Sequence, residues 1–260
     1  MGYHTLSLET SGETSVLTFQ RPEKRNALTN EMIEETVGAL WAVESSPARV
    51  LILTGAGEAF CAGMDVEHLK ALIGQSHQES VEDSQRIATM FRLLHSFPKP
   101  IIAAVNGAAV AGGCGIATMA DFTLAAPGAK FGYPEVRIGF IPAVVAVFLV
   151  RKLGDKLARE LLLSGRLIDA EEARQLGLVN EVVPADKLLD RARELAAHLL
   201  TLSPTSLLYT KRLLHEFSEN EISREIELAI QSNARIRSTA DFHEGVSAFL
   251  EKRKPVWKGH

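Results

Sequence analysis

Two glycine-rich turns contain backbone groups that could stabilise negative charge. Their sequences are AFCAGMD at residues 59–65 and NGAAVAGGCG at residues 106–115. In the second turn, Gly112 and Gly113 fall where a helix is expected to begin, so free N–H groups and the positive end of the helix dipole would face outward. The first turn could aim the N–H of Met64 at the same point. Together the turns predict a site for a developing oxyanion.

A purely conformational role is the alternative for both turns, because most glycine-rich segments only allow the backbone to turn. Two such turns in comparable positions leave the conformational and catalytic interpretations equally open. Nucleotide binding does not fit, since neither turn has the G-x-G-x-x-G spacing and the chain contains no G-x-x-x-x-G-K-[ST] segment.

A third segment, FGYPEVRIGFIP at residues 131–142, contains a candidate acid–base group. Glu135 follows Pro134 and has mainly apolar neighbours, so its carboxylate should be desolvated and better suited to proton transfer at neutral pH. The alternative is a surface glutamate on a helix, or one paired with Arg137.

Cysteines and histidines provide no competing site. Cys61 and Cys114 lie inside the two turns, but no histidine has a suggestive placement beside either, so small buried side chains are expected rather than thiol nucleophiles. No run of Cys and His has metal-ligand spacing, and we expect no metal and no disulfide framework. His68 and His77, near Asp65, are expected on a solvated face and loop.

These segments need elements that position them, and the first half of the chain repeats one plan of a strand, a turn and a helix. Strands are expected over residues 16–19, 50–54, 101–105 and 122–125, and helices from about Asn30, over 66–73 and over 114–120. Polar residues 74–81 predict a mobile loop before a helix over 82–95. The alternation predicts a largely parallel, layered α/β core.

The remainder of the chain is expected to be helical. Asp169 and Glu172 have the spacing of a capping box, and Gly177 is placed to end that helix. Further helices are expected over 188–199, 204–217 and 221–238, and Asp241 with Glu244 predicts a second capping box before a last helix. We therefore divide the chain into an α/β core over 1–195 and a helical region over 196–260.

Composition excludes several classes of partner. The chain has 260 residues, 28 Lys plus Arg against 32 Asp plus Glu, and a net charge of −4, without a basic tract for nucleic acid or an anionic membrane. Residues 101–120 are uncharged, but their Ala and Gly content and Asn106 argue against a membrane span. No signal peptide is recognisable at residues 1–13, so a cytoplasmic location is expected.

The chain resembles the enoyl-CoA hydratase/isomerase, or crotonase, family over nearly all of its length. Five segments in order support this resemblance: RPEKRNAL, AFCAGMDV, KPIIAAVNGAAVAGGCGIATMADF, FGYPEVRIGFIP and LLLSGRLIDAEEARQLGLVNEVV. The resemblance implies a spiral of ββα repeats with a C-terminal helical trimerisation region. It also implies a homotrimer or homohexamer that acts on an acyl-CoA thioester.

The resemblance also implies the site residues. It places an oxyanion hole at the N–H groups of Met64 and Gly112 and the acid–base carboxylate at Glu135. Coenzyme A, as part of the substrate and with no separate cofactor, would contact Lys24, Arg25, Ala27, Ala62, Gly63, Asp65, Val66 and Pro134, with its adenine near residues 62–65. Lys252 or Lys254 could reach a CoA phosphate in a neighbouring subunit.

One departure from the family pattern bears on the reaction. Hydratases that this chain resembles generally have a second glutamate three residues after the glycine of the hole, where this chain has Gly115. We expect an enoyl-CoA hydratase from the breadth of the family. The alternatives are a Δ3-Δ2 enoyl-CoA isomerase that uses Glu135 alone, or a non-catalytic CoA- or RNA-binding member. Bulky residues 143–150 predict a narrow acyl pocket.

Overall fold

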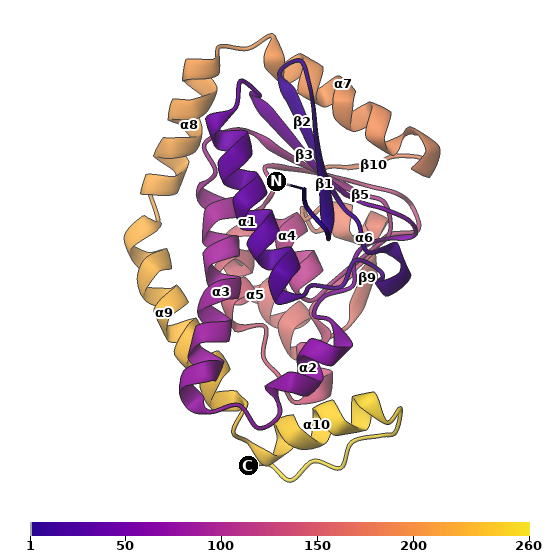
Figure 1. Cartoon of the computed structure of the whole chain (residues 1–260), viewed down its shortest axis with the longest axis vertical. Coiled ribbons are helices and arrows are strands. Elements are labelled where there is room, and N and C mark those ends of the chain that lie inside the picture. The colour runs from indigo at the N-terminus through magenta and orange to yellow at the C-terminus, as the bar shows by residue number, and fades with distance from the viewer. Residues whose placement is uncertain (1) are drawn as a thin grey trace.

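The computed structural model describes residues 2–260, whose strands form two sheets (Figure 1). The larger sheet has the order β1-β2-β3-β5-β7-β10, with strands Leu6–Ser11, Thr14–Phe19, Val50–Gly55, Ile101–Val105, Phe122–Ala125 and Glu181–Val182. The smaller sheet has the order β4-β6-β8-β9, with strands Ala59–Cys61, Ala108–Val110, Lys130–Gly132 and Leu167–Asp169. The four strands expected from the sequence are all present.

Parallel pairing and burial explain the composition of the central strands. Only β1 and β2 pair antiparallel in the larger sheet, and Leu53, Ala103 and Thr123 are in register across β3, β5 and β7. Every residue of β5 is buried, because a parallel sheet is covered on both faces. One face packs against the main core, and the other against the apolar side of helix α7, Leu188–Leu200.

Each repeat of the chain divides its two strands between the sheets. The three repeats are β3, β4 and α2 (Val66–Leu72); β5, β6 and α4 (Gly112–Met119); and β7, β8 and α5 (Ala143–Ser164). The first strand of each repeat joins the larger sheet and the second joins the smaller one. This arrangement confirms the predicted spiral of ββα repeats, and it places the ends of β4, β6 and β8 at one site.

The helix predicted over residues 82–95 begins earlier than expected. Helix α1 spans Asn30–Ser45, as expected, but α3 spans His77–Ser96, so most of the predicted loop over 74–81 is helical. Ser76 and Glu79 form a complete capping box that satisfies the first N–H groups of α3. The polar sequence of this segment therefore reflects a helix start, and the prediction of a mobile loop was wrong.

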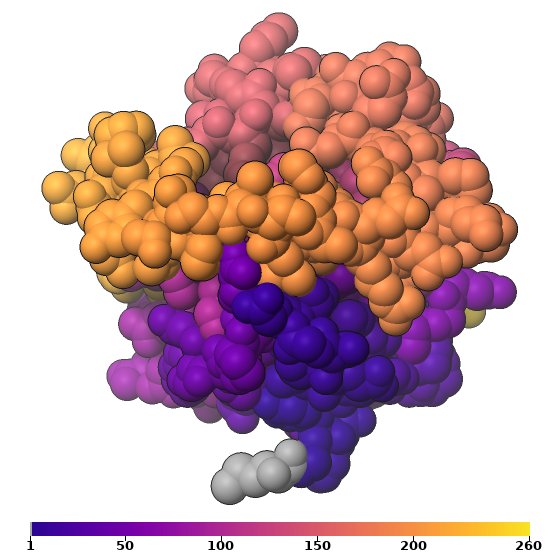
Figure 2. All heavy atoms as spheres, turned by 90° about the horizontal axis from the view of Figure 1, so that it is seen from above, coloured from indigo at the N-terminus to yellow at the C-terminus, as the bar shows by residue number. Residues whose placement is uncertain are grey.

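The C-terminal helices wrap around the α/β core. After α6 (Ala170–Gln175) and α7, the chain forms α8 (Pro204–Glu216), α9 (Glu219–Ile236) and α10 (Ala240–Leu250). Figure 1 shows α8 and α9 along one edge, and in Figure 2 the orange α7 and α8 form a band across the upper face. Helix α9 packs against α3 and α5. The predicted boundary at 195/196 lies inside α7, and that division stays a prediction.

The first predicted capping box forms only in part, and the second, Asp241 with Glu244, does not form. Asp169 does cap α6 by accepting from the N–H of Glu172, whose own carboxylate pairs with Arg166 instead. The last helix is capped by Thr239 and not by Asp241. The Asp241 carboxylate accepts from the N–H groups of residues 258 and 259, and so holds the C-terminal tail against α10.

No helix within residues 2–260 is both long and apolar enough to cross a membrane. The uncharged segment at residues 101–120 forms β5, β6 and α4 instead of one continuous helix, as its Gly and Asn content indicated.

Candidate active site

The two glycine-rich turns contact each other directly. A Cβ at Gly113 would lie 2.0 Å from the carbonyl oxygen of Cys61, and a Cβ at Gly63 would lie 2.9 Å from Cβ of Ala111. Only glycine permits backbones to approach this closely. The glycines are therefore packing requirements, and this packing brings Met64 and Gly112 to the same cavity.

The N–H of Met64 points away from Leu28, the residue with which Met64 forms an isolated parallel bridge. Leu28 donates to the carbonyl of Gly63 at 2.7 Å and accepts from the N–H of Asp65 at 2.9 Å. In such a parallel bridge, the N–H of the residue between the two partners faces the other side. Within residues 2–260, the Met64 N–H has no acceptor.

The N–H of Gly112 is oriented by the residue before it. Ala111 has φ 51° and ψ −123°, a backbone conformation that non-glycine residues rarely adopt. Its N–H donates to Gly132 at 2.8 Å, and its carbonyl accepts from Gly115 at 2.9 Å. Because the carbonyl faces into the helix, the N–H of Gly112 in the same peptide faces outward, and no acceptor for it exists in the described chain. No sequence signal indicated this role for Ala111.

The cavity next to these N–H groups has a volume of about 410 Å³ and is mainly apolar. Its lining comes from the two turns, from the 3-10 helix η2 (Pro134–Ile138), and from α3, α5, α9 and α10. The polar lining side chains are Ser84, Glu135, Arg137 and Asn233. Glu135 is the one carboxylate among the lining residues.

Glu135 is desolvated, as its apolar neighbours predicted. One carboxylate oxygen, Oε2, is buried and has no hydrogen-bond partner in the described part of the chain. Desolvation by burial raises the pKa of Glu135 from 4.5 to about 7. The alternative pairing with Arg137 does not occur among residues 2–260, and Arg137 is exposed. A carboxylate with this pKa can accept and return a proton near neutral pH.

A backbone contact fixes the segment that contains Glu135. A Cβ at Gly139, just after η2, would lie 2.2 Å from the carbonyl oxygen of Asp241, and one at Gly245 would lie 2.3 Å from the carbonyl carbon of Ile138. Helix α10 therefore packs against η2 with glycine on both sides. The last helix of the chain is part of the frame that holds Glu135.

Apolar side chains occupy the space beside Gly115. A Cβ at Gly115 would lie 2.7 Å from Cγ2 of Val145 and 2.8 Å from Cζ of Phe91. A carboxylate could not be placed here without moving both side chains. The lining of the cavity therefore contains no second acid, and the space that its side chain would need beside Gly115 is filled by Val145 and Phe91.

The predicted CoA-binding positions lie on two segments that touch. Lys24 and Arg25 are exposed at the end of the 3-10 helix η1 (Pro22–Lys24), and the carbonyl of Arg25 accepts from the N–H of Ala62 at 3.0 Å. Ala62 and Pro134 line the cavity, whereas Val66 is exposed at the start of α2. Ala27 and Gly63 are buried. Their roles in binding CoA stay predictions.

Two residues that shape this region were missed in the sequence. Asn26 is buried, and its amide donates to the carbonyls of Ala56 and Ala59. Arg21 pairs with Asp65 at 2.9 Å. Burial would raise the pKa of Asp65, but its hydrogen bonds from Arg21 and the N–H of residue 67 outweigh this effect and lower it. Asp65 thus caps α2 and anchors the first turn.

The remaining expectations concern thiols and imidazoles. Cys61 and Cys114 are buried, and burial raises the pKa of each thiol to about 12, so the prediction of inert buried side chains is confirmed. His77 is exposed, as expected. The prediction for His68 was wrong, because it is largely buried and contacts Asp83 at 2.8 Å. The one cluster suited to a metal in the described residues contains His4, which does not line the cavity.

The fold is that of crotonase-like proteins. An enoyl-CoA hydratase/isomerase structure from Xanthobacter autotrophicus Py2 superimposes with a TM-score of 0.89 at 30% identity, over 96% of this chain and 94% of that one. The enoyl-CoA hydratase/isomerase family model matches residues 9–260, and the chain belongs to this family of enzymes.

Two relatives illustrate the similarity in sequence. A Thermus thermophilus protein, provisionally named enoyl-CoA hydratase, is 42% identical over 94% of this chain and 97% of its own length. The crotonyl-CoA hydratase of Syntrophomonas wolfei is 36% identical over 98% of both chains. The similarity therefore extends over nearly the full length of these proteins.

Proposed function

We propose that the chain acts on acyl-CoA thioesters through an enolate and that double-bond isomerisation is the reaction its geometry supports best. The N–H groups of Met64 and Gly112 would hold the thioester oxygen. Glu135 would be the single acid–base group. The observation that carries this proposal is the lone carboxylate in the cavity, with an unpartnered oxygen and a pKa near 7.

The proposed reaction moves one proton between two carbons. The Glu135 carboxylate removes a proton from C2 of a 3-enoyl-CoA, and the electron pair moves to the thioester oxygen to form a dienolate. Two N–H donors stabilise that oxygen, each by roughly 3 kcal/mol if they match measured oxyanion holes. Protonated Glu135 then returns the proton to C4, which leaves a C2–C3 double bond and the original carboxylate.

Hydration of a 2-enoyl-CoA is the second candidate, because the relatives named above are hydratases by name. Water would have to be activated by Glu135 alone, since Phe91 and Val145 fill the space beside Gly115. A non-catalytic CoA- or RNA-binding role has less support: a desolvated carboxylate in an apolar cavity is unfavourable without a function, and the chain is acidic.

A direct comparison of the two reactions tests the proposal. Purified protein is assayed with crotonyl-CoA for hydration and with 3-hexenoyl-CoA for isomerisation, and Glu135→Gln serves as the matched variant. We expect isomerisation to exceed hydration and both to fall in the variant. Faster hydration would favour the second candidate, and no turnover of either substrate would count against enolate chemistry.

Assembly and CoA placement are also proposals. Exposed apolar side chains follow α8 and α9, the helices at the edge of the fold: Tyr209, Leu213, Leu214, Phe217 and Leu228. Such a surface suits subunit contacts, in line with a homotrimer or homohexamer. Coenzyme A would enter as part of the substrate, beside Lys24 and Arg25. Light scattering after gel filtration would measure the assembly.

A further inference from the structure

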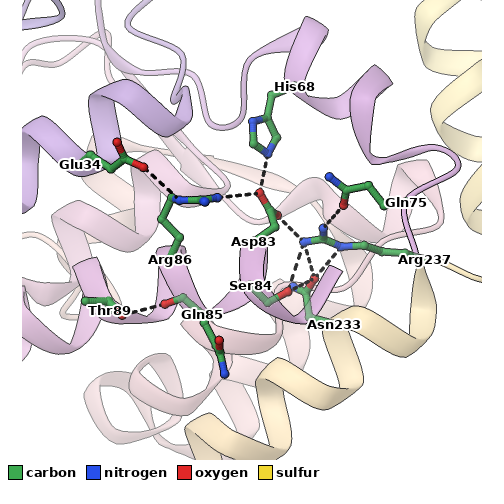
Figure 3. A network of polar contacts seen from close by, with 10 residues as sticks. All are labelled: Glu34, His68, Gln75, Asp83, Ser84, Gln85, Arg86, Thr89, Asn233 and Arg237. Atoms are coloured by element: carbon green, nitrogen blue, oxygen red, sulfur yellow. Dashed lines mark hydrogen bonds and ion pairs between the residues drawn. The ribbon is translucent and has the colours of Figure 1, made fainter. Parts of the chain in front are cut away.

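A polar network forms one part of the mainly apolar cavity wall (Figure 3). Ser84 of α3 and Asn233 of α9 belong both to this network and to the lining, and are 1% and 7% exposed. Behind them lies Arg237, one turn after Asn233, which pairs with Asp83 at 2.8 Å. The proposed isomerisation uses none of these groups.

The amide of Asn233 has a fixed orientation. Its Oδ1 accepts from Oγ of Ser84 at 3.1 Å and from Nε and Nη2 of Arg237 at 3.2 and 3.0 Å. A guanidinium has only donors, so a reversed amide would place N–H groups against N–H groups. The oxygen must therefore face Arg237, and Nδ2 must face away from it.

The Nδ2 group has no protein partner. No acceptor for it occurs in residues 2–260, and it is not among the side-chain atoms sealed from solvent. Asn233 is 93% buried and lines the cavity, and the cavity is therefore the space open to the two N–H groups of Nδ2. Unpaired donors in an apolar setting are unfavourable unless an occupant of the cavity accepts from them.

The charge behind this amide is balanced. Asp83 neutralises Arg237, and Gln75 accepts a further hydrogen bond from it at 3.1 Å. Arg86 also approaches Asp83, at 3.8 Å, and its own charge is paired with Glu34 at 3.2 Å. His68 also contacts Asp83 at 2.8 Å. The cavity is thus presented with a neutral amide donor whose position is set by buried groups, rather than with a cation.

We propose that Asn233 forms a subsite for an oxygen atom carried by the acyl chain beyond its reacting carbons. The shared chemistry is a hydrogen-bond acceptor, as in a hydroxyl, a keto group or a carboxylate. The thioester end is assigned to Met64, Gly112 and Glu135. Apart from the exposed Arg137, the rest of the lining is mainly apolar, so Asn233 is the buried donor that would select among acyl chains. This inference rests on the proposed acyl-CoA function.

Binding of saturated acyl-CoAs tests the subsite independently of the reaction. Calorimetry would compare straight-chain acyl-CoAs of four to eight carbons with the same chains ending in a hydroxyl or a carboxylate. We expect an oxygen-bearing probe to bind about three- to tenfold more tightly than its plain counterpart at one chain length, the yield of one added hydrogen bond. Comparison of the affinities for the hydroxyl-bearing and carboxylate-bearing chains would show which acceptor the subsite prefers.

Asn233→Asp is the matched variant, because it keeps an oxygen for Arg237 and Ser84 but replaces the donor with an acceptor. The preference for oxygen-bearing chains should disappear or reverse. Thr89→Ala, at an exposed position of helix α3, which also carries Ser84, should keep the preference. The subsite proposal would be overturned if plain and oxygen-bearing chains bound equally at every length. It would also be overturned if Asn233→Asp left the preference unchanged. Either result would leave the proposed acyl-CoA function intact. If no acyl-CoA binds, the proposed function fails together with the subsite.

Discussion

Replacement of Glu135 should change activity and stability in opposite directions. Glu135→Gln keeps the size of the side chain but cannot carry a proton, so turnover should fall by roughly 10²-fold or more. The same change removes a charge from a desolvated position. Because burial raises the pKa from 4.5 to about 7, the ionised carboxylate destabilises the folded state by roughly 3 kcal/mol at high pH, at about 1.4 kcal/mol per pH unit.

The sign of this effect follows from linkage. Glutamate in the unfolded chain ionises near pH 4.5, whereas the folded form of Glu135 ionises near pH 7. The favourable contribution of the raised pKa is fully present below pH 4.5 and is lost as pH rises through 7. Relative to wild type, Glu135→Gln should therefore be similar in stability at pH 4.5 and more stable at pH 8.

Urea titrations at several pH values between 4.5 and 8, at one protomer concentration, would measure this difference. Glu9→Gln is the control, because Glu9 is exposed on β1 and has no ion pair in the described chain. In parallel, kcat/KM of wild type should rise with pH and reach half its maximum near pH 7, because the free base is required. A variant that is less stable by the same amount at every pH would show that Glu135 is not desolvated.

Three other changes test the site and its frame. Gly112→Pro removes one proposed donor and should abolish turnover in a protein that remains folded by circular dichroism, whereas Gly112→Ala keeps the N–H, touches only the flexible end of Leu28, and should retain far more activity. Gly115→Ala should lower the free energy of unfolding by about 1–3 kcal/mol in a urea titration, because its Cβ overlaps two core side chains. Deletion of residues 204–260 removes helices whose apolar faces cover the core, and it should yield insoluble protein in a solubility assay.

Local sequence patterns were sufficient where the structure depends on local chemistry. Alternating strands and helices predicted the layered core, and the resemblance supplied the spiral of repeats. The apolar neighbours of Glu135 in the sequence predicted its desolvation. These neighbours stay close to it in the structure, because Glu135 and the residues beside it form the short helix η2. The two turns were found because close backbone contact requires glycine, as at Gly63 and Gly113.

The features that were missed depend on contacts between distant segments. Asp241 had the spacing of a cap, but the tail 17 residues later takes its carboxylate. His68 is buried because Asp83, on the next helix, provides an acceptor. The filled space beside Gly115 involves side chains from α3 and α5, and the backbone of Ala111 is set by Gly132. None of these pairings has a signature in residue spacing.

The glycine contact between η2 and α10 makes the end of the chain part of one cooperative unit with Glu135. Backbones packed this closely cannot separate by small side-chain adjustments, so α10 and η2 should open together or not at all. Amide hydrogens of residues 135–139 and 240–250 should then exchange with a common free energy of opening under native conditions. A fusion or cleavage at the C-terminus that loosens α10 would consequently alter the catalytic segment, although more than a hundred residues separate the two in sequence.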